Sequence, residues 1–336
     1  MSYAVAVDAG GTSTRCVVVA SGGCCLGYSA AGRGNPVSAG VDLAVQSFGD
    51  CIGQALVRAG VAGESIDAVV FSMAGGIVGQ EMTAFVARLR AMGIDRRPVV
   101  KGDLLGSFCS GTPELGGYAL ICGTGAGAAR IEGGAIVAVG DSLGWLLGDN
   151  GSGFWIGRRV ARAAFADMDG SGPETALTTR LLEQLGLPGD GRSEQRGWAH
   201  CYPRPSSMEQ ALRLIYAMRP VEVSQFSRLA FGVDDPVARR IVADAAAALA
   251  RTLTGVVAPE VAGPVVMNGG VVSQNPDFVA AVRAAADVPA TEYVTVTDGV
   301  VGAAVLALRE LGETVGELVF DTIVSTLDQV RQPRPS

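Results

Sequence analysis

The stretch Ala4-Val5-Ala6-Val7-Asp8-Ala9-Gly10-Gly11-Thr12 joins an apolar strand directly to a glycine turn. A second such turn, Gly123-Thr124-Gly125, also follows an apolar strand. Because the side chains in both turns are small, the backbone N–H groups can approach an anion closely, and they can neutralise phosphate without a lysine. Further apolar runs follow the turns at 15–20 and 135–139. The sequence therefore predicts two β-hairpins that together clamp a phosphate chain.

The common nucleotide-binding loops are missing from the sequence. A P-loop needs a lysine after its glycines, but the single lysine is Lys101, and Gly-x4-Gly-Lys-Ser/Thr does not occur. The run Gly123-Thr124-Gly125-Ala126-Gly127 has the wrong spacing for a dinucleotide-binding fingerprint, and no clear helix follows it. If phosphate binds, it is expected to bind the two hairpins.

The composition bounds the class of protein. With 336 residues, of which 49% are hydrophobic, the chain is long enough for two lobes with a large core. A net charge of −7 and the lack of a basic stripe argue against a nucleic-acid partner. No cationic leader precedes residues 4–7, and no uncharged apolar run reaches about 18 residues. We expect a cytoplasmic protein without a membrane partner.

Cysteine and histidine chemistry is largely excluded by the counts of these residues. The seven cysteines form no CxxC pair, so reduced and mostly buried thiols are expected. The single histidine, His200, rules out catalytic triads and histidine-rich zinc sites. Any chemistry must therefore rest on carboxylates.

The order of apolar and helical segments is typical of α/β proteins and is repeated along the chain. Strands are predicted at 4–7, 16–20, 68–72 and 98–101, with helices at 41–59 and 81–92, and a similar series of strands restarts at 118. We expect one lobe at 1–112 and a second at 113–313, with a polar, loop-like insert near 167–207 and a C-terminal helix at 314–330 that packs back on the first lobe. A third glycine turn, Asn268-Gly269-Gly270, ends a buried strand.

Five ordered motifs resemble those of the N-acetylglucosamine kinase and BadF/BadG-type ATPase family, within the sugar-kinase/Hsp70/actin superfamily. They are Asp8-Ala9-Gly10-Gly11-Thr12, Asp103, Gly123-Thr124-Gly125, Gly148-Asp149-Asn150-Gly151-Ser152-Gly153 and Asn268-Gly269-Gly270. The most specific is 148–157, which resembles Gly-Asp-Glu-Gly-Ser-x-x-Trp-Ile-Gly. Overall similarity and composition favour actinobacterial glucosamine kinases. The resemblance implies two RNase H-like, actin-like ATPase lobes with ATP in the cleft between them.

The resemblance also implies roles for the glycine turns. Asp8 would carry Mg²⁺ through water, in agreement with the residues themselves, since a carboxylate beside two glycines can hold a hydrated hard cation against phosphates. The alternative is an aspartate that only satisfies the N–H groups of its own turn. The nucleotide contacts would be Gly10, Gly11 and Thr12 in the first hairpin, Gly123, Thr124 and Gly125 in the second, and Gly269 and Gly270 at the adenosine.

Asp103 follows a strand at the end where ligands bind in such sheets, and it matches the catalytic aspartate of the family. It would accept the proton of the attacking sugar hydroxyl. The alternative is an aspartate that caps the next helix. Leu104-Leu105-Gly106 is bulkier than the family's small residues at this point.

The same resemblance carries over the sugar contacts. Asn35 could equally be a turn residue before Pro36, and the acidic residue that the family has after Asp149 is replaced here by Asn150. The expected sugar contacts are Asn35, Gly75, Gly76, Asp103, Gly144, Trp145 and Asp149.

These features predict a kinase that transfers phosphate from ATP to the 6-hydroxyl of an amino sugar. Glucosamine is favoured over N-acetylglucosamine. The ammonium of glucosamine would pair with a carboxylate, whereas an acetamide would need an apolar pocket, and aromatic residues make up just 6% of the chain. One alternative is a BadF-type ATPase activator of a redox partner, but Cys109 and Cys122 do not match its cluster pattern. Another is a sugar-sensing repressor, whose DNA-binding elements are missing. A homodimer is left open.

Overall fold

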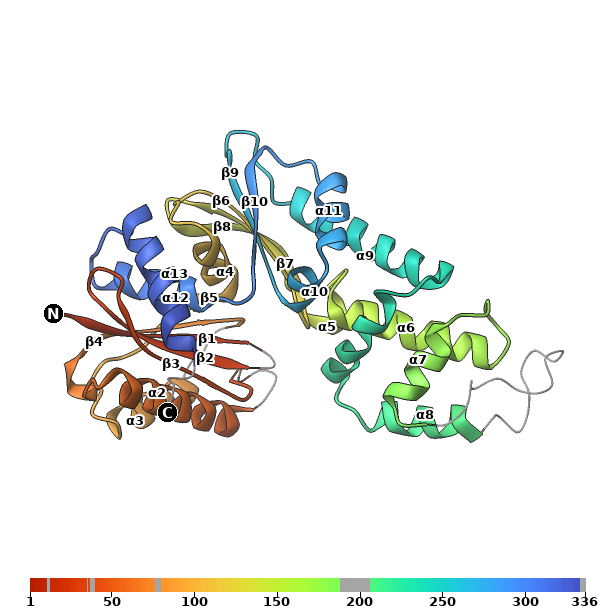
Figure 1. Ribbon diagram of the computed structural model, residues 1–336, viewed down its shortest axis with the longest axis horizontal. Helices are drawn as coiled ribbons and strands as arrows, with labels where there is room; N and C mark the ends of the chain where they lie inside the picture. The colour runs from red at the N-terminus through yellow and green to blue at the C-terminus, as the bar shows by residue number, and fades with distance from the viewer. Residues whose placement is uncertain (11–12, 35, 37–39, 76–79, 188–205, 333–336) are drawn as a thin grey trace.

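The computed structural model describes residues 1–10, 13–34, 36, 40–75, 80–187 and 206–332, and it contains two five-stranded sheets of the same topology (Figure 1). The first has the order β3-β2-β1-β4-β5, and the second β10-β9-β6-β7-β8. In each, an antiparallel three-strand meander is extended by two parallel strands. The strands are β1 (Tyr3–Ala9), β2 (Thr14–Ala20), β3 (Cys25–Ala31), β4 (Ile66–Met73), β5 (Val99–Gly102), β6 (Gly117–Cys122), β7 (Ala126–Glu132), β8 (Ala135–Asp141), β9 (Gly263–Asn268) and β10 (Ala290–Val296). The predicted hairpins and the predicted repeat are confirmed.

Both faces of the first sheet are covered by helices (Figure 1). Side chains alternate between the faces of a strand, so Val5 and Val7 pack under α2 (Val41–Ala59) and α3 (Gln80–Arg90), while Ala4 and Ala6 face the other way. The opposite face carries α4 (Asp103–Gly111), α12 (Val300–Glu310) and α13 (Glu317–Arg331). α13 is fixed to the edge strand β3, where the Cys25 N–H donates to Thr326 Oγ1 at 2.9 Å.

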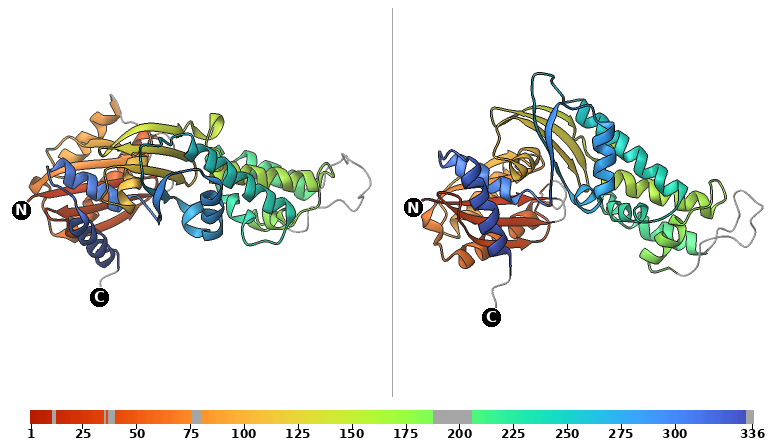
Figure 2. Two further views of the ribbon diagram at one scale, coloured as in Figure 1. Left: turned by 90° about the horizontal axis from the view of Figure 1, so that it is seen from above. Right: turned by 45° about the horizontal axis from the view of Figure 1, so that its top comes forward.

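The second sheet packs one face on a large helical layer (Figure 2). α7 and α8 lie at the end of the molecule farthest from the first sheet (Figure 1). The remaining helices, in order, are η1 (Gly63–Ser65), α5 (Gly144–Leu147), α6 (Gly153–Met168), α7 (Leu177–Gln184), α8 (Ser206–Tyr216), η2 (Pro220–Ala230), α9 (Pro236–Thr254), α10 (Gly270–Gln274) and α11 (Pro276–Ala285).

Helices α4 and α12 cross between the two sheets, and one core joins residues of both. The crossing is close, because a Cβ at Gly302 would overlap the carbonyl oxygen of Gly106. The Gly302 N–H donates to Ser110 Oγ at 2.8 Å, and that hydroxyl donates to Gly106 O at 2.9 Å. Although α12 falls within the range 113–313, it packs on β1 and β4. The boundary expected at 112 and 113 therefore separates the sheets, but not their helices.

Two segments differ from the sequence-based expectation. Strand β3 was not predicted, because Cys25–Ala31 is rich in small residues and contains Gly27, which gives a weak strand signal. The start of the expected polar insert is a packed element, since Leu177, Leu181 and Leu182 of α7 are fully buried in the second core. The rest of the insert, 188–205, lies outside the described residues and includes His200. In the part of the chain that is described, no helix is long and apolar enough to cross a membrane.

Candidate active site

The carboxyl ends of β1, β4 and β5 meet at one edge of the first sheet, because these strands run parallel. Asp8 near the end of β1 lies opposite Ser72 of β4, which in turn lies opposite Lys101 of β5. Asp103 follows β5 directly as the first residue of α4. The charge of Asp103 contributes to raising the pKa of Asp8. The topology thus brings together the two aspartates that the sequence singled out as metal-binding and catalytic.

The side chain of Asp8 is 14% exposed and takes part in a charge network. Its Oδ2 accepts the Gly299 N–H at 3.0 Å and lies 3.7 Å from Arg15 Nη1. Burial, together with the charge of Asp298, raises the pKa of Asp8 to about 6, although Arg15 and Gly299 oppose the shift. A buried carboxylate that is only partly compensated favours a bound cation.

Asp298 and its partners complete this network and were missed by the sequence reasoning. Asp298 Oδ2 lies 3.5 Å from Arg15 Nε, and Arg331 Nη2 donates to both Asp298 oxygens at 2.8 and 3.0 Å. The only local signal was the dipeptide Asp298-Gly299 just before a helix. Arg331 comes from α13, so the last helix of the fold helps to fix the surroundings of Asp8.

The first turn is closed by the Gly10 N–H, which donates to Ser13 O at 2.9 Å. The expected contacts Gly11 and Thr12 lie outside the described residues. Lys101 forms an ion pair with Glu310, with its Nζ 2.6 Å from Oε1, so the single lysine is engaged by a helix of the core.

The predicted phosphate turn at 123–125, the predicted adenosine turn and the start of α6 lie against one another. The Gly123 N–H donates to Gly125 O at 3.0 Å, and the Gly153 N–H of α6 donates to Gly123 O at 2.8 Å. Gly269 has φ 113°, and a Cβ there would overlap the backbone of Cys122 and Gly123. Only glycine fits at this contact. The structure therefore places the predicted turns at 123–125 and 269–270 side by side.

Asp103 shows part of the capping role that was the alternative to catalysis. Its Oδ1 accepts the Leu104 N–H at 2.9 Å, while the N-cap residue itself is Gly102. Burial raises the pKa of Asp103, and the charge of Asp149 raises it further. Asp149 belongs to the second half of the molecule, so the charge of a carboxylate from that half acts on Asp103.

Asp149 is anchored to the second phosphate turn. It adopts a left-handed backbone with φ 55°, and its Oδ1 accepts the Ala126 N–H at 3.0 Å. Asp141 holds the far end of the same loop, since it accepts the Asp149 N–H at 2.7 Å and both the backbone N–H and Nδ2 of Asn150, at 2.9 and 3.0 Å. Partial burial opposes ionisation, but the hydrogen bonds from Asn150 and Asp149 lower the pKa of Asp141 overall.

These bonds give a role to Asn150, which stands where the sequence resemblance implies an acidic residue. The amide donates to the Asp141 carboxylate, whereas an acidic side chain would bring a like charge to the same place. Sequence reasoning could not connect the two, because the importance of Asp141 depends on a loop that returns to it.

Asp141→Asn is expected to loosen this loop. The substitution replaces one acceptor oxygen by an N–H₂ group that faces donors, at a cost of about 1–3 kcal/mol in unfolding free energy. We expect a lower Tm at pH 7. Since the folded-state pKa of Asp141 is lowered, its stabilising effect exists above its unfolded pKa and is lost as pH falls through the folded value. The Tm difference between variant and wild type should therefore shrink below about pH 4; a constant difference would contradict this role.

Three of the other expected sugar contacts, Gly75, Gly144 and Trp145, belong to the described residues. Gly75 and Gly144 both have positive φ, of 73° and 78°. Trp145 is 38% exposed and packs edge-on against Phe154, with ring centres 5.5 Å apart. Asn35 and Gly76 lie outside the described residues. The structure thus puts Gly75 at the end of β4 and Gly144 and Trp145 at α5, in different halves of the molecule.

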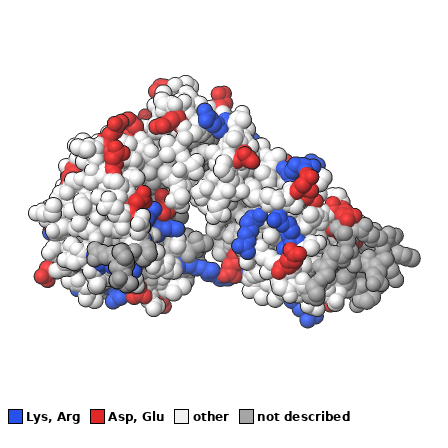
Figure 3. Space-filling view, viewed as in Figure 1, with Lys and Arg blue, Asp and Glu red and all other residues white. Residues whose placement is uncertain are grey.

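A hollow separates the two halves, and charged side chains lie along it (Figure 3). Arg33, just after β3, reaches Glu222 of η2 with 3.3 Å between Nη2 and Oε1. Glu222 also accepts a hydrogen bond from the backbone N–H of Arg219 at 3.0 Å. An ion pair therefore connects the first half to the second.

The residues around Asp8 fit a hydrated magnesium ion better than a metal ion bound by several protein side chains. Among the described residues, no group of three or more His, Cys, Asp or Glu side chains is placed to hold a metal. Mg²⁺ keeps several waters and binds through one or two carboxylates and substrate phosphates, which suits the single buried carboxylate of Asp8. Cys109 and Cys122 are fully buried, so neither can reach a cluster between subunits.

Comparison with known proteins identifies the family. The model of the BadF/BadG/BcrA/BcrD ATPase family matches residues 5–307. The chain is 27% identical to an N-acetyl-D-glucosamine kinase of Dictyostelium discoideum over 75% of this chain and 78% of the relative. It is 29% identical to glucosamine kinase GspK of Vibrio cholerae, over 55% of this chain and 62% of that protein.

Solved structures agree on the fold. A protein from Chromobacterium violaceum, named as a candidate N-acetylglucosamine kinase, superimposes with a TM-score of 0.68 at 21% identity, over 91% of this chain and 99% of that one. A ROK family glucokinase of Streptomyces griseus gives a TM-score of 0.54 at 16% identity, over 91% and 99% of the two chains. The two sheets thus have the actin-like arrangement expected from the sequence. Since the family model spans nearly all of both sheets and the helices between them, the chain belongs to the BadF/BadG/BcrA/BcrD ATPase family.

Proposed function

We propose that the protein is an ATP- and Mg²⁺-dependent kinase that phosphorylates the 6-hydroxyl of glucosamine. The observation that carries this proposal is the convergence of three aspartates: the charge of Asp103 acts on Asp8, the charge of Asp149 acts on Asp103, and Asp149 accepts the Ala126 N–H just after the turn at 123–125. The named activities of two sequence relatives, one acting on N-acetylglucosamine and one on glucosamine, support an amino sugar as acceptor.

In this proposal Asp103 accepts the proton of the sugar hydroxyl while the bond from that oxygen to the γ-phosphorus forms and the bond to the ADP oxygen breaks. A pKa raised by burial makes Asp103 a stronger base than an ordinary aspartate. N–H groups of the turns at 10–12 and 123–125 bind the phosphates, and Asp8 is the residue that would hold hydrated Mg²⁺ there. The bound ion would neutralise charge on the phosphate oxygens, and the protein would otherwise contribute by positioning the sugar hydroxyl and the γ-phosphate.

Glucosamine is proposed because its ammonium can pair with a carboxylate in the cleft. Asp149 and Glu222 of the second half are candidates, since the charge of Asp149 acts on Asp103 and Glu222 pairs with Arg33 of the first half. One observation favours N-acetylglucosamine instead. Trp145, Leu146 and Leu147 of α5 are 38, 73 and 77% exposed, which is an apolar surface that an acetamide methyl group could cover.

The test is ADP release with Mg-ATP and glucosamine, N-acetylglucosamine, glucose or no sugar, with the phosphorylated position determined by NMR. Stimulation by glucosamine well above the other sugars supports the proposal. A preference for N-acetylglucosamine would keep the proposed kinase reaction but make N-acetylglucosamine its substrate. ATP hydrolysis that no sugar stimulates would overturn a kinase and favour an ATPase activator.

A further inference from the structure

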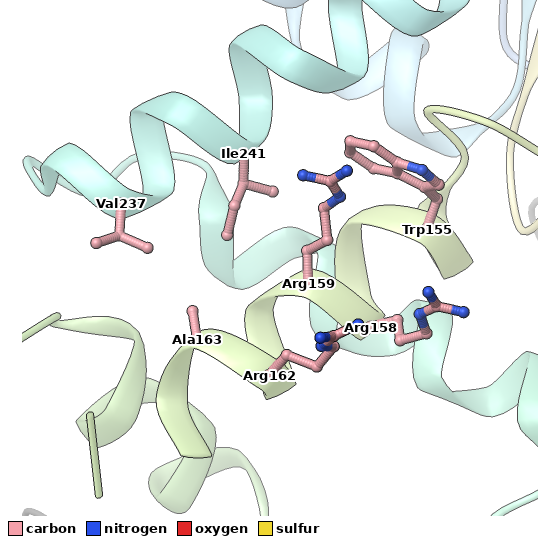
Figure 4. Close-up of a pocket in the computed structure, with 7 residues that line it drawn as sticks. All are labelled: Trp155, Arg158, Arg159, Arg162, Ala163, Val237 and Ile241. Carbon is pink, nitrogen blue, oxygen red and sulfur yellow. The ribbon is translucent and has the colours of Figure 1, made fainter. Parts of the chain in front are cut away.

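A cavity of about 360 Å³ lies between α6 and α9 and is lined by arginines (Figure 4). Its apolar part is formed by Ala163, Val237 and Ile241. Its polar part is a single face of α6, where residues three and four apart are neighbours. This face carries Trp155, Arg158, Arg159 and Arg162.

The three arginines differ in their partners: Arg159 interacts with neighbouring side chains, whereas Arg158 and Arg162 do not in the described part of the chain. Arg159 turns toward Trp155, with its Cζ 3.8 Å from the ring centre, and its Nη1 lies 3.1 Å from Asp244 Oδ2 (Figure 4). Arg158 and Arg162 are exposed, and neither makes an ion pair or hydrogen bond with another residue in the described part of the chain. In a chain with net charge −7, two uncompensated guanidinium groups one helical turn apart form a local positive site.

The cavity is separate from the nucleotide cleft. Gly153 and Gly157 lie on the face of α6 that contacts the second phosphate turn and η2. Arg158 and Arg162 lie on another face of the same helix, which lines the cavity. A nucleotide held by the glycine turns would therefore leave this cavity open.

We propose that the cavity binds a small phosphorylated molecule, with its phosphate between Arg158 and Arg162 and its body against Ala163, Val237 and Ile241. Planar guanidinium groups bind phosphate through paired N–H donors, and two of them at successive turns of a helix can hold one dianion. The apolar wall and a volume within the range of small-molecule pockets select a ligand that has a carbon body besides its phosphate. The site goes beyond the proposed kinase reaction and does not depend on it.

The test is calorimetric titration of the full chain with phenyl phosphate and with inorganic phosphate, after the cleft is saturated with Mg²⁺ and a non-hydrolysable ATP analogue. Phenyl phosphate combines a dianion with an apolar ring, so it should bind more tightly than inorganic phosphate. The double variant Arg158→Gln/Arg162→Gln should weaken it at least about tenfold. Arg240→Gln is the matched control, because Arg240 is exposed on α9 but does not line the cavity; it should bind as the wild type does.

Three results would overturn the proposal: no binding at about 10 mM, equal binding by the double variant, or equal loss in the control. Should the double variant fail to fold, Arg162→Lys alone decides, since lysine keeps the charge but loses the paired donors. An intermediate affinity supports the site, whereas unchanged affinity contradicts it. A successful kinase assay with no phenyl phosphate binding would reject this site and leave the proposed function standing.

Discussion

Asp103→Asn is expected to fold and to bind nucleotide as the wild type does, while its turnover with the preferred sugar falls at least about 10²-fold. Asparagine has the same shape, and its Oδ1 can still accept the Leu104 N–H, so the start of α4 should be kept. What is lost is the group that takes the hydroxyl proton. The measurement is steady-state ADP release, together with calorimetric binding of a non-hydrolysable ATP analogue.

The control is Asp67→Asn, since Asp67 is an exposed residue of β4 whose side chain pairs with Arg96 at 3.5 Å, away from the cleft. Its turnover should stay within about twofold of wild type, because such surface pairs contribute little. Turnover of Asp103→Asn close to wild type would remove Asp103 from the reaction and leave it as a helix-capping residue.

The pH profile gives a second measure of the same role. The pKa of Asp103 is raised above its ordinary value by burial and by Asp149, so kcat/KM of the wild type should rise with pH as Asp103 ionises. In Asp103→Asn, kcat/KM of the remaining activity should no longer rise with pH in this range. An acid limb that survives unchanged in the variant would have to come from another group, of which Asp8 is the nearest candidate.

Local patterns in the sequence were sufficient for most of the fold. α2 spans 41–59 as predicted, because an apolar face at helical spacing is closed by Gly60 in a left-handed conformation. β1 and the turn after it were recognised because β-branched and small residues run directly into glycines. β3 and α7 were missed, since Gly27 and a polar, glycine-rich context hide side chains whose burial is decided by distant partners.

The predicted site was incomplete for the same reason. Asp8, Asp103 and the glycine turns each have a local signature, and topology then brings them together. Asp298 has only the glycine that follows it before a helix, and Arg331 has no local signature, because their importance comes from the pairing of Arg15, Asp298 and Arg331 after the chain has returned to the first sheet. Charge networks built from three remote segments are beyond what spacing along a single sequence can indicate.

Asp8→Asn is expected to abolish phosphate transfer and, in the absence of ligands, to make the protein more stable. Asp8 has a pKa of about 6 in the folded protein, against an ordinary value of 3.8. The folded state therefore binds more protons than the unfolded state between these values, and stability falls as pH rises from about 4 to 6. Above pH 6 the full penalty applies, at most about 3 kcal/mol for a shift of this size. Asparagine removes the penalty, so the variant should melt several degrees higher at pH 7.5.

The sign of this difference separates a metal site from a structural aspartate. Below about pH 4, Asp8 is protonated in both states, so wild type and variant should melt at similar temperatures. Mg-ATP should stabilise the wild type at pH 7.5 and the variant much less, because only the carboxylate attracts the ion. A variant that is less stable than wild type at pH 7.5 would mean that the bonds to Gly299 and Arg15 outweigh burial, and that Asp8 serves the turn rather than the metal. Without ligands, the ionised Asp8 destabilises the folded protein. A bound cation would neutralise this charge, and the relief of the destabilisation would contribute to the affinity for Mg-ATP.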